Sequence, residues 1–112
     1  MDTKKILTFV ILAYKESPFL ESCIKSVLRQ SIECEIIIAT TTPNDFITKL
    51  AKKYRLPITV GKHTNIGGDF DLAIHSASTP LVTVAHQDDI YEKTYAKQVI
   101  KAYQKYPNSS II

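Results

Sequence analysis

Several sequence features are missing from this chain, and each missing feature excludes a class of protein. No stretch approaches the roughly 20 apolar residues that span a bilayer, and no signal-peptide cleavage pattern follows the apolar segment near the N-terminus. The net charge is only +3, too small to indicate a nucleic-acid binder, and the basic residues are spread along predicted helices as on solvated helix faces. The three glycines form neither a G-x-G-x-x-G nor a Walker pattern. We therefore expect an ordinary globular domain that does not bind nucleic acid.

Cysteine is also scarce, with only Cys23 and Cys34. Two cysteines do not make a disulfide framework, and neither has a spacing typical of metal ligands. Cys23 falls on the apolar stripe of a predicted helix, which favours a buried free thiol. Both observations indicate a reducing setting, and we expect a cytoplasmic protein.

The 112 residues suffice for one domain, 1–112, in which strand and helix patterns alternate four times. The strands are short, β-branched apolar runs, and the helices show apolar residues at helical spacing. The pattern predicts a parallel α/β sheet of about four strands with helices on both faces. We expect strands at 6–13, 35–39, 56–60 and 81–85, and helices at 17–30, 46–54, 67–77 and 92–106, before a further strand begins near 109–112.

The strand at 81–85 leads directly into His86-Gln87-Asp88-Asp89. In open α/β sheets, ligands bind in the crevice beyond the carboxyl ends of the strands. Two adjacent carboxylates repel each other unless a positive charge lies nearby, and Mg²⁺ or Mn²⁺ prefers such oxygen ligands. Mg²⁺ held by one or two carboxylates usually also binds substrate phosphates. The pattern therefore predicts a metal and phosphate site.

Each polar residue near this edge also has a plainer interpretation. Asp89 can cap the following helix while its neighbour binds metal. His86 can bind metal or phosphate or only pack at the strand end, and Gln87 can donate to ribose or phosphate or face solvent. Tyr14 can stack on a base or lie half-buried. Glu16 can accept from a base or favour a helix N-terminus.

A second polar segment, Asn65-Ile66-Gly67-Gly68-Asp69, can be interpreted in two ways. Backbone N–H groups at a helix N-terminus bind anions, which would suit a phosphate. The same residues can simply shape the turn before the third helix. His63 and His75 have no partners at metal spacing, and we expect both at the surface.

Four segments, taken in order, resemble the nucleotide-binding half of inverting family-two glycosyltransferases with the GT-A fold. They are residues 10–16 followed by 20–31, then 35–38, 65–68 and 82–89, within a resemblance that runs from Ile6 to about Tyr106. Each segment alone is only a weak match to the family, but the order and spacing of all four together are specific to it. The resemblance implies a Rossmann-like sheet that binds a nucleoside-diphosphate sugar.

In that family, the segment matching Ala13, Tyr14 and Glu16 lines the base pocket. The family usually has aspartates after the second strand, one of which contacts the base. Here Thr40 and Thr41 stand at those positions. Threonine can hydrogen-bond but carries no charge, so we expect Thr41 to contact the nucleotide without fixing which base is bound.

The family's aspartate-rich motif after the fourth strand holds the ribose and a divalent metal on the diphosphate. Carried over, Asp88 is the principal metal ligand with Asp89 beside it, and His86 and Gln87 lie near ribose and phosphate. His86 stands where many members have the first aspartate. This exchange removes one negative charge and can lower metal affinity or make the metal less essential.

The resemblance implies transfer of a sugar, from a UDP-sugar by preference, to a hydroxyl of a glycan or lipid-linked acceptor during cell-surface glycan synthesis. Members place the catalytic base and acceptor region beyond the point where this chain stops. We therefore assign no catalytic residue and expect the chain alone to be inactive, prone to self-association, and in the cytoplasm or at the inner face of the plasma membrane. The alternative is a non-catalytic nucleotide-sugar or metal-binding module. A receiver-type domain is disfavoured, because the second strand ends in threonines.

Overall fold

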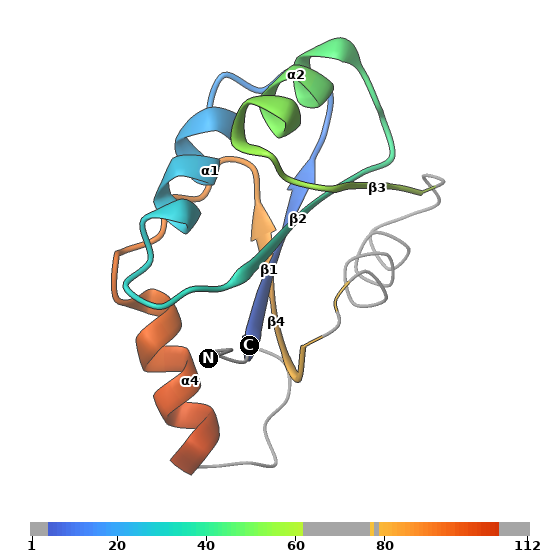
Figure 1. Cartoon of the computed structure of the whole chain (residues 1–112). Coiled ribbons are helices and arrows are strands. Elements are labelled where there is room, and N and C mark those ends of the chain that lie inside the picture. The colour runs from blue at the N-terminus through green and yellow to red at the C-terminus, as the bar shows by residue number, and fades with distance from the viewer. Residues whose placement is uncertain (1–4, 62–76, 78, 106–112) are drawn as a thin grey trace.

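The computed structural model describes residues 5–61, 77 and 79–105 (Figure 1). The predicted helix at 67–77 and the segment 65–69 lie outside the described residues except for Ala77, as do His63, His75 and the expected final strand. No described helix is long and apolar enough to cross a membrane. The elements are β1 (Leu7–Ala13), α1 (Leu20–Leu28), β2 (Glu35–Thr40), α2 (Asp45–Tyr54), β3 (Ile58–Val60), β4 (Leu81–His86) and α4 (Tyr95–Lys105).

The four strands form one parallel sheet in the order β3-β2-β1-β4. β1 lies in the interior and pairs with both β2 and β4, as its nearly continuous apolar sequence predicts for a strand covered on both faces. β3 is a three-residue edge strand, and Pro57 directly precedes it, which agrees with the restriction of proline to strand starts and edges. The predicted α/β fold with a parallel sheet is confirmed.

The side chains of β1 alternate between the two faces of the sheet. Leu7, Phe9 and Ile11 are fully buried in one core together with apolar residues of α1, α2 and α4. Val10 points to the opposite face, where it packs with Val82. The three described helices thus contribute to one core, which agrees with their arrangement in Figure 1.

Helix α1 begins later than the sequence pattern predicts. The predicted helix starts at residue 17, but α1 begins at Leu20 and its N-cap, Phe19, makes no side-chain cap bond. The Ser17 hydroxyl instead accepts a hydrogen bond from the Phe19 N–H at 3.2 Å. This local bond forms a turn that competes with the helix, a known tendency of serine.

Helix α4 also begins later, at Tyr95 rather than near Glu92. Its first turn is hydrogen-bonded by Gln30, which lies just after α1. Gln30 accepts a hydrogen bond from the Ala96 N–H at 2.8 Å and donates from its amide to the Glu92 carbonyl at 2.7 Å. A side chain far away in the sequence therefore caps α4 in place of a neighbouring residue. These bonds join the C-terminal end of α1 to the N-terminal end of α4.

Candidate functional site at the carboxyl edge of the sheet

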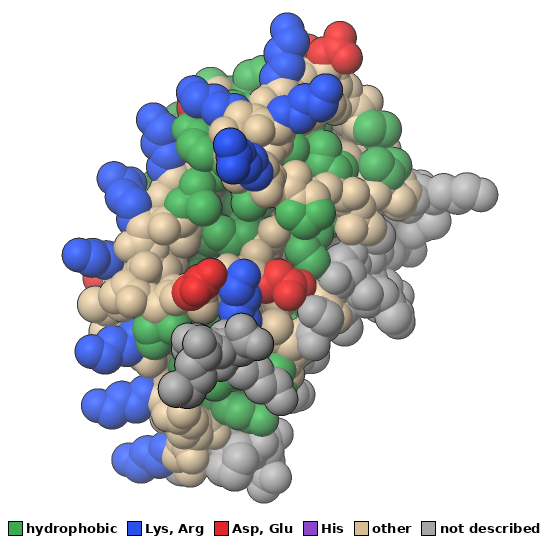
Figure 2. Space-filling model, viewed as in Figure 1, with side chains coloured by type: hydrophobic (Ala, Val, Ile, Leu, Met, Phe, Trp, Pro, Cys, Tyr) green, Lys and Arg blue, Asp and Glu red, His purple; other side chains and the backbone are tan. Residues whose placement is uncertain are grey.

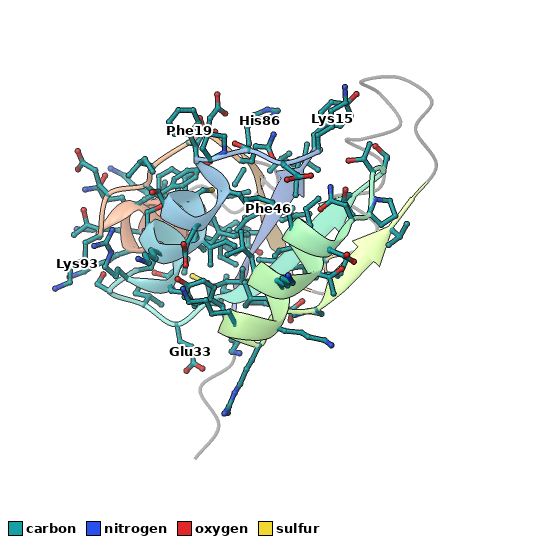
Figure 3. All side chains as sticks on the ribbon, turned by 90° about the horizontal axis from the view of Figure 1, so that it is seen from above. Lys15, Phe19, Glu33, Phe46, His86 and Lys93 are labelled. Atoms are coloured by element: carbon teal, nitrogen blue, oxygen red, sulfur yellow. The ribbon has the colours of Figure 1, made fainter. Side chains whose placement is uncertain are left out.

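The loops after β1 and β4 are joined by the side chain of Gln87. Its Oε1 accepts from the Tyr14 N–H at 2.9 Å, and its Nε2 donates to the Tyr14 carbonyl at 3.1 Å. The amide thus pairs with both backbone groups of Tyr14 just beyond the last register pair, Leu12 with His86. Figure 3 looks onto this end of the sheet and shows Lys15 and His86 on the same side of the molecule. Gln87 is half-buried and positions the Tyr14 loop.

The loop after β2 holds the next residue, Lys15, in a left-handed conformation with φ of 55°. The Lys15 N–H donates to Thr42 Oγ1 at 2.8 Å, and the Lys15 carbonyl accepts from Asn44 Nδ2 at 3.0 Å. Asn44 Oδ1 also caps α2 by accepting from the Ile47 N–H at 2.9 Å. All three polar loops therefore converge, as the sequence predicts for carboxyl ends of parallel strands.

Sequence analysis missed Thr42 and Asn44 as residues that shape this edge. A signal was available for Asn44, because asparagine immediately before an apolar helical stripe is a typical N-cap. No signal was available for the conformation of Lys15, since a left-handed backbone is uncommon outside glycine, asparagine and aspartate. The structure shows that the two side chains bonded to the Lys15 backbone hold this conformation.

The two adjacent carboxylates have different surroundings. Asp89 Oδ2 accepts from the His86 N–H at 3.2 Å, and the Asp89 N–H donates to the His86 carbonyl at 2.9 Å, so Asp89 closes the turn after β4. Asp88 is exposed, and its carboxylate has no hydrogen bond or ion pair with any residue that the structure describes. One carboxylate thus holds the loop while the other faces outward, as the sequence interpretation anticipated.

The negative charge of this pair acts on the residues beneath it. The Cys23 thiol lies 3.5 Å from the His86 carbonyl, and burial, then the charges of Asp89 and Asp88, raise its pKa to about 12. Burial, followed by the charge of Asp89, also raises the pKa of Tyr91. Burial is the larger cause of both shifts, and the aspartates add to it because a nearby negative charge disfavours ionisation of the thiol and the phenol.

The remaining predicted ligand residues lie at the same edge with different accessibility. Ala13 is buried as the last residue of β1, so its backbone alone can meet a ligand. Tyr14 is 44% exposed and Glu16 is exposed. Of the two threonines that replace the family's aspartates, Thr40 is buried and its hydroxyl accepts a backbone N–H within its own loop. Thr41 is half-buried and is the more accessible of the two.

Within residues 5–61, 77 and 79–105, no group of three or more His, Cys, Asp or Glu side chains could hold a metal ion. Cavities bordered by described residues include one of about 370 Å³ near Cys34 and Arg55, and one of about 260 Å³ beside Tyr91 and Tyr95. A metal at Asp88 would therefore need further oxygen ligands, which the phosphates of a nucleotide supply at many Mg²⁺ sites. The exposed carboxylate fits that arrangement.

The family model for Glycosyl transferase family 2 matches residues 8–112. The chain belongs to glycosyl transferase family 2. No curated protein matches this family 2 chain significantly in sequence.

Solved structures similar to this family 2 chain share its fold at low identity. The crystal structure of S. aureus TarS matches with a TM-score of 0.74 and 19% identity, over 91% of this chain and 20% of that one. TarS 1–349 matches with a TM-score of 0.74 and 16% identity, over 91% of this chain and 33% of that one. A CMP:2-keto-3-deoxy-manno-octonic acid synthetase complexed with CTP matches with a TM-score of 0.72 and 12% identity, over 92% of this chain and 49% of that one. The family 2 chain thus spans a fifth to a half of the length of these structures.

Proposed function

We propose that this chain binds the nucleoside-diphosphate sugar donor of a glycosyltransferase at the carboxyl edge of its sheet. The observation that carries the proposal is the double hydrogen bond between Gln87 and Tyr14. It joins the loop that the family resemblance assigns to the base to the loop that bears Asp88. A nucleotide lying across this edge would meet both loops in a fixed relation. Membership of glycosyl transferase family 2 supports the same ligand class.

The proposed roles follow from accessibility. The half-exposed ring of Tyr14 would stack on the base, and Glu16 would accept from a base N–H. The Thr41 hydroxyl would hydrogen-bond near the base, since no carboxylate is present there. His86 is exposed at the end of β4 and would lie against ribose or phosphate. Gln87 would act by positioning Tyr14, because its amide is engaged with that backbone. UDP-sugars remain the favoured donors.

Asp88 would hold Mn²⁺ or Mg²⁺ together with diphosphate oxygens. When bound, such a metal neutralises the charge that develops on the leaving diphosphate. Asp89 would keep the turn closed through the His86 N–H, which leaves Asp88 free to face the ligand. Because Asp89 is engaged in its own turn and Asp88 is the exposed carboxylate of the pair, we expect weak metal affinity without nucleotide and stronger affinity with it.

In the complete enzyme, an acceptor hydroxyl of a glycan or lipid would attack the anomeric carbon of the bound sugar, after losing its proton to a base. No residue of this chain is assigned as that base. We place the activity in cell-surface glycan synthesis, in the cytoplasm or at the inner membrane face. The alternative is a module that binds the nucleotide sugar without transferring it.

Calorimetric titration with UDP, GDP and CDP, with and without Mn²⁺, tests the proposal. The variants are Asp88→Ala and a matched control, Glu33→Ala, which removes one exposed carboxylate near the opposite end of the sheet. We expect metal-dependent binding of UDP that Asp88→Ala loses and Glu33→Ala keeps. A folded chain that binds no nucleotide, or that binds equally well after Asp88→Ala, would contradict the proposed site.

A further inference from the structure

Helix α4 carries three lysines in line and no acidic residue. Lys97, Lys101 and Lys105 are spaced by four residues, and Lys93, in the turn before the helix, continues the same spacing. Residues four apart lie on one face of a helix, so these side chains form a row. All four are exposed.

Helix α1 extends this row. Lys25 and Arg29 are exposed and again four residues apart. Gln30 and Ser31 hydrogen-bond to the backbone of Glu92 and Lys93, which fixes α1 against the start of α4. Figure 2 shows Lys and Arg side chains following one another down one side of the molecule, over α1 and α4. We call Lys25, Arg29, Lys93, Lys97, Lys101 and Lys105 the basic row.

The basic row concentrates charge that the whole chain does not have. With Glu92, the acidic residue at its centre, the row is net +5. The chain has 14 basic and 11 acidic residues, so the remainder has eight basic and ten acidic residues and is net −2. A net charge of +3 therefore conceals an uneven distribution of charge, because the basic row carries more positive charge than the whole chain.

The lysines of the basic row also reduce the stability of helix α4. Like charges four residues apart destabilise a helix, and neither Lys97 nor Lys101 has an acidic residue three or four positions away. Neither Lys97 nor Lys101 makes an ion pair with a described residue. At these two positions the like charges cost helix stability without a compensating ion pair, which is a sign of function.

We propose that the basic row binds the surface of an anionic lipid membrane. Five of its six cations are lysines, which act as point charges and need no fixed partner geometry, as suits a diffuse layer of headgroups. Nucleic acid fits less well, because the exposed residues of α4 between the lysines are Gln98, Ala102 and Gln104, which offer no aromatic ring for base stacking.

This surface is compatible with ligand binding at the carboxyl edge but does not depend on it. Helix α4 follows β4 and lies beside the sheet, while β1 and β4 end at the top of Figure 1. Contact along the basic row would leave that edge open to water. Failure of nucleotide binding and failure of membrane binding are therefore separate outcomes, measured with different ligands.

Sedimentation with phosphatidylcholine vesicles containing 30% phosphatidylserine, at low salt, tests the proposal. The variant is Lys97→Gln/Lys101→Gln, and the control is Lys49→Gln/Lys52→Gln on α2, which removes the same charge from two exposed helical lysines. Each lysine near an anionic membrane contributes about fivefold, so we expect the variant to bind about 25-fold more weakly. The control should bind like the unmodified chain.

Further measurements test whether the basic row binds the membrane through its charge. Binding should disappear with pure phosphatidylcholine and fall at 0.5 M salt, because the attraction is electrostatic and screened. The melting temperature of Lys97→Gln/Lys101→Gln should not fall, since the change relieves repulsion. No sedimentation of the unmodified chain, equal losses in both double variants, or tighter binding to duplex DNA than to the vesicles at the same salt would each overturn the proposal.

Discussion

Replacing Gln87 by methionine removes the contact on which the proposed donor site depends. Methionine has a similar length but cannot make the two hydrogen bonds to the Tyr14 backbone, at 2.9 and 3.1 Å. The two hydrogen bonds that join the loops after β1 and β4 through this side chain would then be lost. We expect the variant to fold, because the parallel register of β1 and β4 ends at Leu12 with His86, before this contact.

The magnitude follows from the two bonds and their exposure. A hydrogen bond in a folded protein contributes about 1 kcal/mol net, which sets an upper value of about 2 kcal/mol for the pair. Gln87 is half-buried, so water replaces part of the loss. We expect the free energy of unfolding to fall by about 1–2 kcal/mol, and the melting temperature by roughly 5–10 °C for a domain of this size. UDP binding in the presence of Mn²⁺ should weaken by about three- to tenfold.

Urea unfolding followed by circular dichroism, together with calorimetric titration of UDP and Mn²⁺, measures both effects. The matched control is Gln104→Met on α4, whose side chain is exposed and has no hydrogen bond with a described residue. It should change stability by less than about 0.5 kcal/mol. The reasoning is refuted if Gln87→Met matches this control in stability. If stability falls while nucleotide affinity stays unchanged, the contact is structural and the ligand does not depend on it.

Three other perturbations test the surrounding structure. Asn44→Ala should lower the free energy of unfolding by about 1 kcal/mol through loss of the α2 cap, and should loosen Lys15; unchanged urea unfolding would contradict this. Gln30→Met removes three hydrogen bonds at the junction of α1 and α4 and should cost about 2–3 kcal/mol in the same assay, whereas a loss below about 0.5 kcal/mol would show that the junction does not need them. Because the pKa values of Cys23 and Tyr91 are raised by burial, the unfolded chain releases these protons first, so unfolding free energy should fall as pH rises from about 9 toward 12. The fall should be smaller in Cys23→Ala, and an equal fall would assign it to other groups.

The sheet was predictable because its strands depend on local patterns. β1 and β4 are mostly apolar runs followed by polar residues, and the structure places their ends within one residue of the predicted positions. The starts of α1 and α4 were not predictable, because one is shifted by a serine turn and the other is capped by Gln30, which lies far away in the sequence, just after α1. Such long-range caps leave no local pattern.

The candidate site was predictable in position but not in its internal bonding. The carboxyl edge follows from strand order alone, and one of two adjacent aspartates was expected to bond to the backbone, as Asp89 does. The engagement of Gln87 with Tyr14 joins residues 73 positions apart, which no local pattern indicates. Residue types thus identify where chemistry can occur, whereas the side chains that hold the loops emerge only from the fold.

Nuclear magnetic resonance of the ¹⁵N-labelled chain with UDP and substoichiometric Mn²⁺ shows directly whether nucleotide and metal bind at the carboxyl edge of the sheet. A bound paramagnetic ion broadens the amide signals of nearby residues. We expect selective broadening at Tyr14, Thr41 and residues 86–89, with no effect on Glu33 or Arg55 near the other end of the sheet. Broadening at Glu33 and Arg55, or none at the carboxyl edge, would contradict the proposed donor site.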